Sequence, residues 1–210
     1  MEFNQSLIIK GGLFMWPLLI LGIACFFILL ERIIFFHRVS INVKSFLDGI
    51  KNLLEKRRLV EALTLCEENT SPVANTLKSV LMNYDKTQDA MLASAKNAAL
   101  IEIPIMEKGL RIISFIARIA PFIGFMGTCL AVIQSFDRMN QIGPYANTVA
   151  FSGDISQALI TTLTGIFIGI IAYSSHHFLS MRVHSIVQDT EWAIHNLVEF
   201  LLHNLPEDKK

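Results

Sequence analysis

The sequence predicts an all-α integral membrane protein with three transmembrane helices, long helices extending into the cytoplasm, and a helical cytoplasmic insert between spans 1 and 2. Hydrophobic residues make up 52% of the 210 residues, and the mean hydropathy is +0.48, which is high for a soluble domain. Three apolar stretches each approach or exceed the roughly 20 residues that a membrane-spanning helix needs. The rest of the chain shows helical periodicity and no strand-like alternation.

The first membrane span is preceded by a short amphipathic lead, residues 1–12, which we expect to lie at the membrane interface. Residues 13–36 form the span itself, with Trp16 near one end, as is typical of interfacial tryptophan. A single lysine precedes the span and no small-residue cleavage motif ends it, so we expect a retained anchor rather than a signal peptide. Glu31 and Arg32 lie near its other end, where an anchoring role is expected.

Residues 37–110 form a predicted cytoplasmic helical region. Ser71 followed by Pro72 is typical of a helix N-cap and first helical position, so a helix should begin there. An alanine-rich helix is expected to begin near Gln88 and to continue into the membrane. The chain contains no phosphate-binding loop, HExxH, GxSxG or paired acids, so we expect neither an enzyme nor a cofactor.

The second predicted span comprises residues 111–136. Arg118 lies on its cytoplasmic side, one turn before Pro121. One interpretation is an arginine that reaches the interface as an anchor, and the other is a charge at the cytoplasmic mouth of an ion path. The sequence leaves both open.

The third predicted span comprises residues 155–179 and follows an outer loop, residues 137–154. Ser152 or Asp154 is expected to cap this span. Residues 180–210 continue as an amphipathic cytoplasmic helix that ends near a proline and a charged tail.

The distribution of basic residues predicts the orientation. Basic residues follow the first span, precede the second and follow the third. They are Arg32, Arg38, Lys44, Lys51, Lys56, Arg57 and Arg58 after the first; Lys96, Lys108, Arg111 and Arg118 before the second; and Arg182 after the third. The N-terminal lead has only Lys10, and the outer loop only Arg138. The positive-inside rule therefore places the N-terminus outside and the C-terminus in the cytoplasm. The formal net charge of zero gives no reason to expect a nucleic-acid partner.

Small and polar residues form one straight seam on each of the last two spans. On the second span they are Pro121, Gly124, Thr128, Ala131 and Ser135; on the third, Ala158, Thr162, Gly165, Gly169, Ala172 and His176. Alternating spacings of three and four residues place each set on one face of a helix. Such seams let membrane helices approach each other closely. We expect close helix–helix packing at Gly124, Gly127, Ala131, Ala158, Gly165 and Gly169. A three-span monomer has little surface to cover both seams, so a homo-oligomer is expected.

The histidines and cysteines do not have the spacing of a metal site. His177 and His184 are seven residues apart, whereas helical ligands normally lie at i and i+4. The three cysteines are far apart and form no CxxC motif. A small membrane enzyme that uses His176, His177 or Cys129 stays open as an alternative, as does a non-conducting scaffold packed through the seams.

Two motifs resemble the MotA/TolQ/ExbB proton-channel family, and its ExbB/TolQ branch in particular. Residues 116–136 (IARIAPFIGFMGTCLAVIQSF) are similar to the second-span pattern aPxxGLxGTVxGxxxsF, and residues 155–173 (ISQALITTLTGIFIGIIAY) to the third-span pattern IxEALxxTaxGLxxAIPA. The span order, the large insert and the orientation also match that branch. The resemblance covers the whole chain in layout and is specific from residue 112 onward.

The resemblance implies a pentamer of this subunit in the cell inner membrane, around two copies of a single-span ExbD/TolR-like partner that carries a membrane aspartate. It also implies a TonB/TolA-like energy transducer, contact with membrane lipids, and the use of the proton motive force for work on the envelope or transport across the outer membrane. Thr128 and Thr162 match the threonines that face the partner aspartate, and Thr161 and Gln157 complete the expected ion pathway.

Independently of the resemblance, the seams contain hydroxyl groups but no carboxylate. An ion carrier needs an anionic or titratable group in the low-dielectric zone, so the acid must come from another subunit if this chain conducts. Gln157 stands where the family usually has glutamate, and Ile171 where it often has proline, so the role of the glutamate does not transfer. The extra hydroxyls of Thr161 and Thr164 favour sodium somewhat, although protons remain the first expectation.

Overall fold

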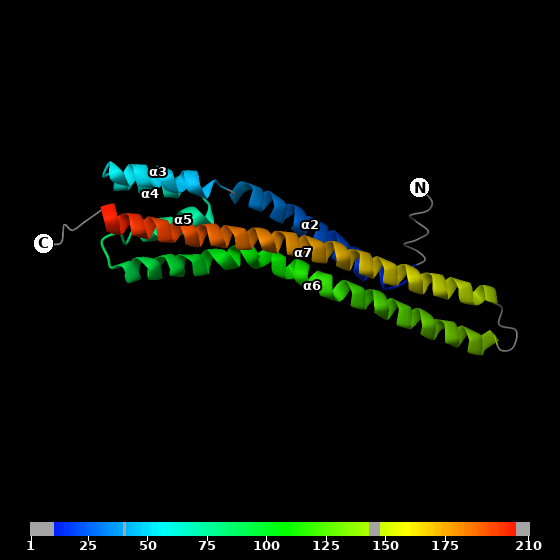
Figure 1. Ribbon diagram of the computed structural model, residues 1–210. Coiled ribbons are helices and arrows are strands. Elements are labelled where there is room, and N and C mark those ends of the chain that lie inside the picture. The colour runs from blue at the N-terminus through cyan, green and yellow to red at the C-terminus, as the bar shows by residue number, and fades with distance from the viewer. Residues whose placement is uncertain (1–10, 40, 143–147, 205–210) are drawn as a thin grey trace. The chain divides into compact units, whose positions relative to one another are not determined.

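The computed structural model describes residues 11–39, 41–142 and 148–204 (Figure 1). Within these ranges every regular element is a helix: α2 Met15–Val39, α3 Val43–Glu55, α4 Leu59–Glu68, α5 Pro72–Leu81, α6 Gln88–Ile142 and α7 Thr148–Asn204. Three of the helices are long and apolar enough to cross a membrane. The predicted all-α fold with three spans and a helical insert is therefore confirmed.

The chain divides into two compact units. The first unit consists of Met1–Glu31 and Gly109–Phe178 and contains the apolar parts of α2, α6 and α7. The second unit consists of Arg32–Lys108 and Leu179–Lys210 and contains α3, α4, α5, the beginning of α6 and the end of α7. Both α6 and α7 run through the predicted span boundaries without a break, as the sequence suggested for a helix beginning near Gln88.

The second unit is a helical bundle around one apolar core. Its fully buried members come from α3, α4, α5, α6 and α7: Leu47, Ile50, Ala62, Cys66, Leu77, Val80, Leu81, Met91, Ala95, Ala193 and Leu197. Each large aliphatic side chain contributes about 1.5–3 kcal/mol by its removal from water. Burial raises the pKa of the Cys66 thiol to about 11, so this cysteine behaves as a small apolar side chain.

Two helix starts in this unit show how the sequence sets element boundaries. Ser71 caps α5 as predicted: its Oγ accepts a hydrogen bond from the Ala74 amide at 3.2 Å, and Pro72 is the first helical residue. The cap satisfies one of the amide groups that a helix start leaves without a partner.

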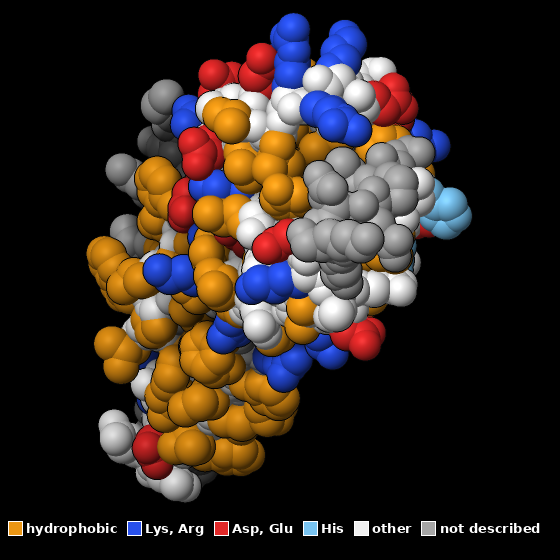
Figure 2. Space-filling model, turned by 90° about the vertical axis from the view of Figure 1, so that its left-hand side faces the viewer, with side chains coloured by type: hydrophobic (Ala, Val, Ile, Leu, Met, Phe, Trp, Pro, Cys, Tyr) orange, Lys and Arg blue, Asp and Glu red, His pale blue; other side chains and the backbone are white. Residues whose placement is uncertain are grey.

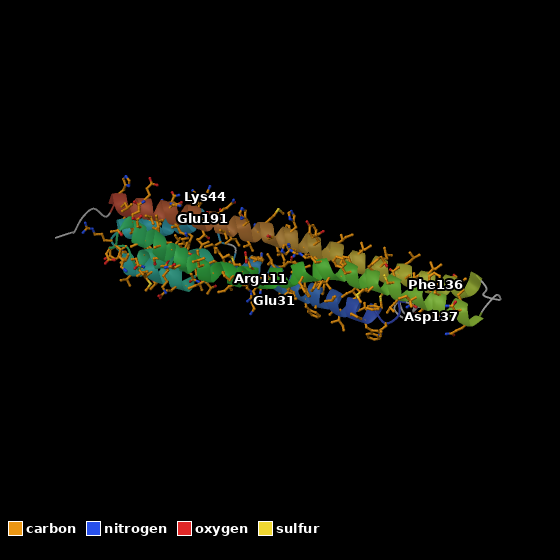
Figure 3. All side chains as sticks on the ribbon, turned by 90° about the horizontal axis from the view of Figure 1, so that it is seen from below. Glu31, Lys44, Arg111, Phe136, Asp137 and Glu191 are labelled. Atoms are coloured by element: carbon orange, nitrogen blue, oxygen red, sulfur yellow. The ribbon has the colours of Figure 1, made fainter. Side chains whose placement is uncertain are left out.

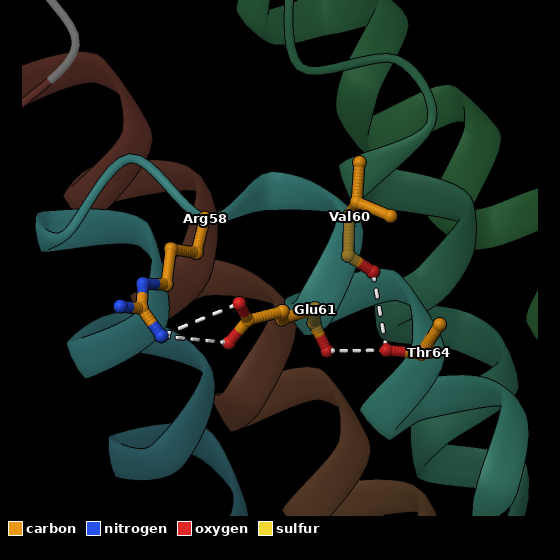
Figure 4. A network of polar contacts seen from close by, with 4 residues as sticks. All are labelled: Arg58, Val60, Glu61 and Thr64. Atoms are coloured by element: carbon orange, nitrogen blue, oxygen red, sulfur yellow. Dashed lines mark hydrogen bonds and ion pairs between the residues drawn. The ribbon is translucent and has the colours of Figure 1, made fainter.

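The turn from α3 to α4 has no side-chain cap. Arg57 adopts a positive φ of 57°, and Arg58 Nη1 lies 3.3 Å from a Glu61 carboxylate oxygen in the first turn (Figure 4). Thr64 Oγ1 donates to the carbonyls of Val60 at 3.2 Å and Glu61 at 2.9 Å. An exposed ion pair and local hydroxyl bonds hold this turn, and such pairs stabilise a protein by less than about 1 kcal/mol.

The first unit presents many large apolar side chains outward. Phe26, Phe27, Phe122, Phe125, Leu159, Leu163 and Phe167 are each more than half exposed. A water-exposed surface of this kind would be unstable, whereas lipid tails or neighbouring membrane helices would cover it. On the face shown in Figure 2, hydrophobic side chains predominate in the lower part of the picture, and most charged side chains lie above them. In Figure 3, Arg111 marks one end of the apolar stretch of α6, and Phe136 and Asp137 mark the other.

The helices extend further into the predicted outer loop than the sequence suggested. α6 continues to Ile142 and α7 begins at Thr148. The expectation that Ser152 or Asp154 caps the third span is therefore wrong, since both lie inside α7. The physical reason is that Asp154 is engaged from α6 by Arg138, whose Nη1 lies 2.9 Å from Asp154 Oδ1, so both helices are stabilised beyond the apolar stretch.

Candidate functional site: a threonine pair in the seam between α6 and α7

The candidate site lies where α6 and α7 pack against each other through their small residues. A Cβ atom added to Gly124 would lie 3.0 Å from the carbonyl oxygen of Thr161 and 3.2 Å from the Cα of Gly165. One added to Gly165 would lie 2.7 Å from the carbonyl oxygen of Ala120. Main chain thus packs directly on main chain here, which only glycine permits.

The same packing continues toward the predicted cytoplasmic side. A Cβ at Gly169 would lie 2.8 Å from the Cγ of Pro121, so this proline ring fills the space beside the glycine. Ala131 and Ala158, the seam residues toward the other end, are both buried. The structure therefore brings the second-span and third-span seams together as one contact surface within a single subunit. The two seams cover each other, so the expectation that a homo-oligomer is needed to cover them is wrong.

Thr128 and Thr162 meet in the middle of this seam. Their hydroxyl groups are hydrogen-bonded to each other. Thr162 Oγ1 is 3.0 Å from the carbonyl oxygen of Ala158, and each hydroxyl lies 3.4 Å from the carbonyl oxygen of Gly124. A hydroxyl has one proton to donate and two lone pairs, so one threonine donates to the other and the second donates to a carbonyl. The capacity that remains on this pair is acceptor capacity, which suits a cation or a proton donor.

Thr161 lies next to this pair, whereas the Gln157 side chain lies apart from it. Thr161 is 1% exposed, and its hydroxyl donates to the Gln157 and Ala158 carbonyls at 3.0 Å each. A Cβ at Gly127 would lie 2.8 Å from Thr161 Oγ1, so Thr161 fits against α6 at that glycine. The Gln157 amide lies against Gly12, which has a positive φ of 67°.

Three of the four predicted pathway residues therefore meet at one carbonyl group. The hydroxyls of Thr128, Thr161 and Thr162 lie 3.4, 3.0 and 3.0 Å from the carbonyl oxygen of Ala158. The Gln157 side chain lies apart from them, against Gly12. Arg118, the predicted cytoplasmic-mouth residue, is exposed. Around the pair, the sequence of α6 has no acid between Arg118 and Asp137.

The seam ends, near the connection of α6 to α7, in two buried polar residues, of which the sequence analysis had placed only Ser135 in the seam. Asp154 on α7 is 4% exposed and Ser135 on α6 is 5% exposed. The signal was present in the spacing, because Asp154 precedes Ala158 by four residues and extends the same face of the helix. Because a loop was expected up to residue 154, Asp154 was not assigned to this face of the helix.

The histidines and cysteines of the described residues form no group of three potential metal ligands with one another or with acids. His184 instead contacts Gln188 one turn along α7, with 3.2 Å between the His184 Nε2 and the amide nitrogen. Cys129 is exposed on α6.

Comparison with known proteins agrees with this layout. The profile of the MotA/TolQ/ExbB proton channel family matches residues 68–192, more than half of the chain. An ExbB-like biopolymer transport protein of Synechocystis sp. is 23% identical over 205 residues, which cover 95% of this chain and 97% of that protein. The biopolymer transport protein ExbB of Neisseria meningitidis is 23% identical over 197 residues, or 89% of each chain.

An archaeal ExbB homolog from Methanothermobacter thermautotrophicus is 25% identical over 179 residues, which cover 83% of this chain but only 62% of that protein. The residues matched by the family profile include both seams, the threonine pair and the beginning of α6. With three membrane-spanning helices and this match, the chain is a membrane protein that belongs to the MotA/TolQ/ExbB proton channel family.

Proposed function

We propose that this chain is the ion-conducting stator subunit of an inner-membrane motor. With an ExbD/TolR-like single-span partner, it converts the proton motive force into mechanical work on the cell envelope or transport across the outer membrane. The observation that carries the proposal is the Thr128–Thr162 pair, placed in a close-packed seam within a chain of the proton channel family.

The role of the partner follows from what the seam lacks. The α7 sequence has no acid between Asp154 and Asp189, and the pair offers acceptor oxygens rather than a titrating group. A carboxylate from a partner helix supplies the anion that a proton or sodium ion needs in a low-dielectric region. Protons are the first candidate, and sodium is the second because hydroxyl and carbonyl oxygens ligate hard cations.

The proposed arrangement has the N-terminus in the periplasm and the second unit, with the C-terminus, in the cytoplasm. The basic residues of α3, of the turn into α4 and of the beginning of α6 support this orientation by the positive-inside rule. Residues 13–36, 111–136 and 155–179 then form the spans, and Arg118 lies at the cytoplasmic mouth.

A non-conducting scaffold is the second candidate, and one observation favours it. The Thr128 and Thr162 hydroxyls bond to each other and to carbonyl oxygens of the same subunit, and the glycines bring main chain against main chain. Packing alone therefore accounts for the residue choice at most seam positions. The acceptor capacity left on the threonine pair is what conduction requires and packing does not.

Assembly is tested by co-expression of the full chain with a tagged ExbD/TolR-like protein of the same organism. We expect purification through that tag to recover this chain, and native mass spectrometry to give five copies with two copies of the partner. A version of the partner with asparagine in place of its membrane aspartate should still assemble, because packing rather than charge holds the complex. Recovery of the chain only as a monomer, free of the partner, would contradict the proposed motor.

A further inference from the structure

The outer end of the α6–α7 seam carries a polar cluster that the proposed pathway does not use. It consists of Ser135 and Arg138 on α6 and Asp154 on α7. We call these three residues the outer cluster. Asp154 lies one turn beyond Ala158, past the end of the close-packed seam, and is 4% exposed. The proposed orientation places this end outside.

The outer cluster is in register with the threonine pair. The contacts of Gly169 with Pro121, Gly165 with Gly124, and Thr162 with Thr128 define an antiparallel pairing in which one helix advances as the other retreats. Ser135 follows Thr128 by seven residues on α6, and Asp154 precedes Thr162 by eight residues on α7, so the same pairing places Ser135 opposite Asp154. Two helical turns separate the cluster from the pair, or about 10 Å along the helix.

The ion pair shows that this register holds at the outer end. Arg138 follows Ser135 by three residues on α6, and its Nη1 lies 2.9 Å from Asp154 Oδ1. The Arg138 side chain is 57% exposed, whereas that of Asp154 is 5% exposed. The Arg138 guanidinium therefore reaches the buried Asp154 carboxylate from the exposed surface of the subunit.

Two buried oxygens of the cluster have no hydrogen-bond partner among the described residues: Asp154 Oδ2 and Ser135 Oγ. Other seam hydroxyls, such as those of Thr161 and Thr162, donate to a carbonyl one turn earlier, and the Ser135 hydroxyl does not. A buried carboxylate oxygen without a partner is costly, so such an oxygen favours a ligand that satisfies it. A carboxylate oxygen and a hydroxyl oxygen from facing positions of two helices are hard ligands of the kind that a small cation binds.

We propose that the outer cluster is the entry site for the transported monovalent cation, sodium or a hydrated proton, and that Arg138 competes with that cation for Asp154. The proposal deepens the stator function and rests on it. The cation binds to Asp154 Oδ2 and Ser135 Oγ, while Arg138 holds Oδ1 and weakens the binding through like-charge repulsion. Along the helices, this site lies about two turns from the threonine pair.

The competition gives a prediction that a purely structural ion pair does not. Asp154→Asn removes the anion, so the external cation concentration that half-saturates uptake should rise at least about tenfold, as for the loss of one charge-assisted contact. Arg138→Gln removes the competitor and should lower that concentration. Ser135→Ala should raise it by a smaller factor than Asp154→Asn. If the ion pair only held the two helices together, Asp154→Asn and Arg138→Gln would shift the half-saturating cation concentration in the same direction.

The test uses the purified complex of the full chain with its single-span partner in liposomes. Initial uptake is measured against external sodium at constant pH, and against external pH without sodium, so the two arms identify the ion. Charged groups of α6 and α7 at this end are Asp137, Arg138 and Asp154, and the described residues of α2 before Glu31 carry none. Asp137→Asn is the matched control, since Asp137 is exposed on the same turn of α6 and should leave the half-saturating concentration unchanged.

Opposite shifts for Asp154→Asn and Arg138→Gln, with complex yield preserved, support the entry site. Equal half-saturation for wild type, Asp154→Asn and Arg138→Gln would overturn it, as would shifts of the same sign in both. Should Asp154→Asn fail to assemble, Ser135→Ala decides: an unchanged half-saturating concentration would refute the site. Failure of the stator function itself looks different, because the wild-type complex would then take up neither ion.

Discussion

Replacement of Thr162 by valine should leave the complex assembled and reduce ion-driven activity about 10-fold to 100-fold, the range expected for the loss of one buried hydrogen bond to a charged group. Valine keeps the branched shape of threonine and has a methyl group in place of the hydroxyl. The Thr162 atom nearest to Gly124 is the Cα, which the substitution leaves in place. The same change at Thr128 should give a similar loss. Complex yield and a gradient-dependent activity are measured side by side.

The double variant separates one shared site from two independent effects. Because the two hydroxyls are bonded to each other, the loss in Thr128→Val/Thr162→Val should be less than the product of the two single losses. Thr164→Val is the matched control: its hydroxyl donates to the Ile160 carbonyl at 2.8 Å within α7 and contacts no seam partner in any described hydrogen bond. Wild-type activity in the double variant, with normal assembly, would mean that the seam is only a packing surface.

Replacement of Gly165 by alanine should abolish accumulation of the folded complex. The new Cβ would lie 2.7 Å from the Ala120 carbonyl oxygen and 2.9 Å from the Gly124 Cα, and both atoms are main chain that cannot turn aside. Separation of α6 from α7 would relieve the clash, but it would also break the contacts of the threonine pair. Overpacking of this kind costs about 1–3 kcal/mol where side chains can adjust, and more where only main chain can move.

Gly153→Ala provides the control on the same helix. No atom lies within 4 Å of a Cβ built at Gly153, so alanine should be accepted there and slightly favoured by its helix propensity. The measurement is the yield of monodisperse complex and its thermal stability in detergent. Normal yield of Gly165→Ala would show that the close approach of α6 and α7 is not required for the fold.

Much of the fold could be predicted from the sequence because each element obeys a local rule. The spans follow from apolar length, and the start of α5 follows from the Ser71–Pro72 pair, whose cap is present. The seam residues could be found because spacings of three and four put them on one helical face. The meeting of Thr128 and Thr162 also follows, since antiparallel helices joined by a short connection are neighbours.

Other features of the site depend on contacts between residues far apart in the sequence, which local sequence rules do not predict. Asp154 was expected at a helix start because aspartate favours N-caps, and Arg138, sixteen positions earlier, instead pairs with it inside the helix. Gln157 was grouped with the threonine pair because it is close in sequence, yet its side-chain amide lies against Gly12. One position along a helix turns a side chain by about 100°, so the Thr161 hydroxyl lies beside Gly127 while the Thr162 hydroxyl bonds to Thr128.

The most direct test of the central claim is ion uptake into liposomes by the chain alone and by its complex with the single-span partner. The seam supplies acceptor oxygens and the partner supplies the carboxylate, so the complex should conduct, and the chain alone should not. The complex with asparagine in place of the partner's membrane aspartate should be as inactive as the chain alone. Equal uptake by the chain alone, or full uptake by the aspartate variant, would contradict the claim that conduction needs an acid from another subunit.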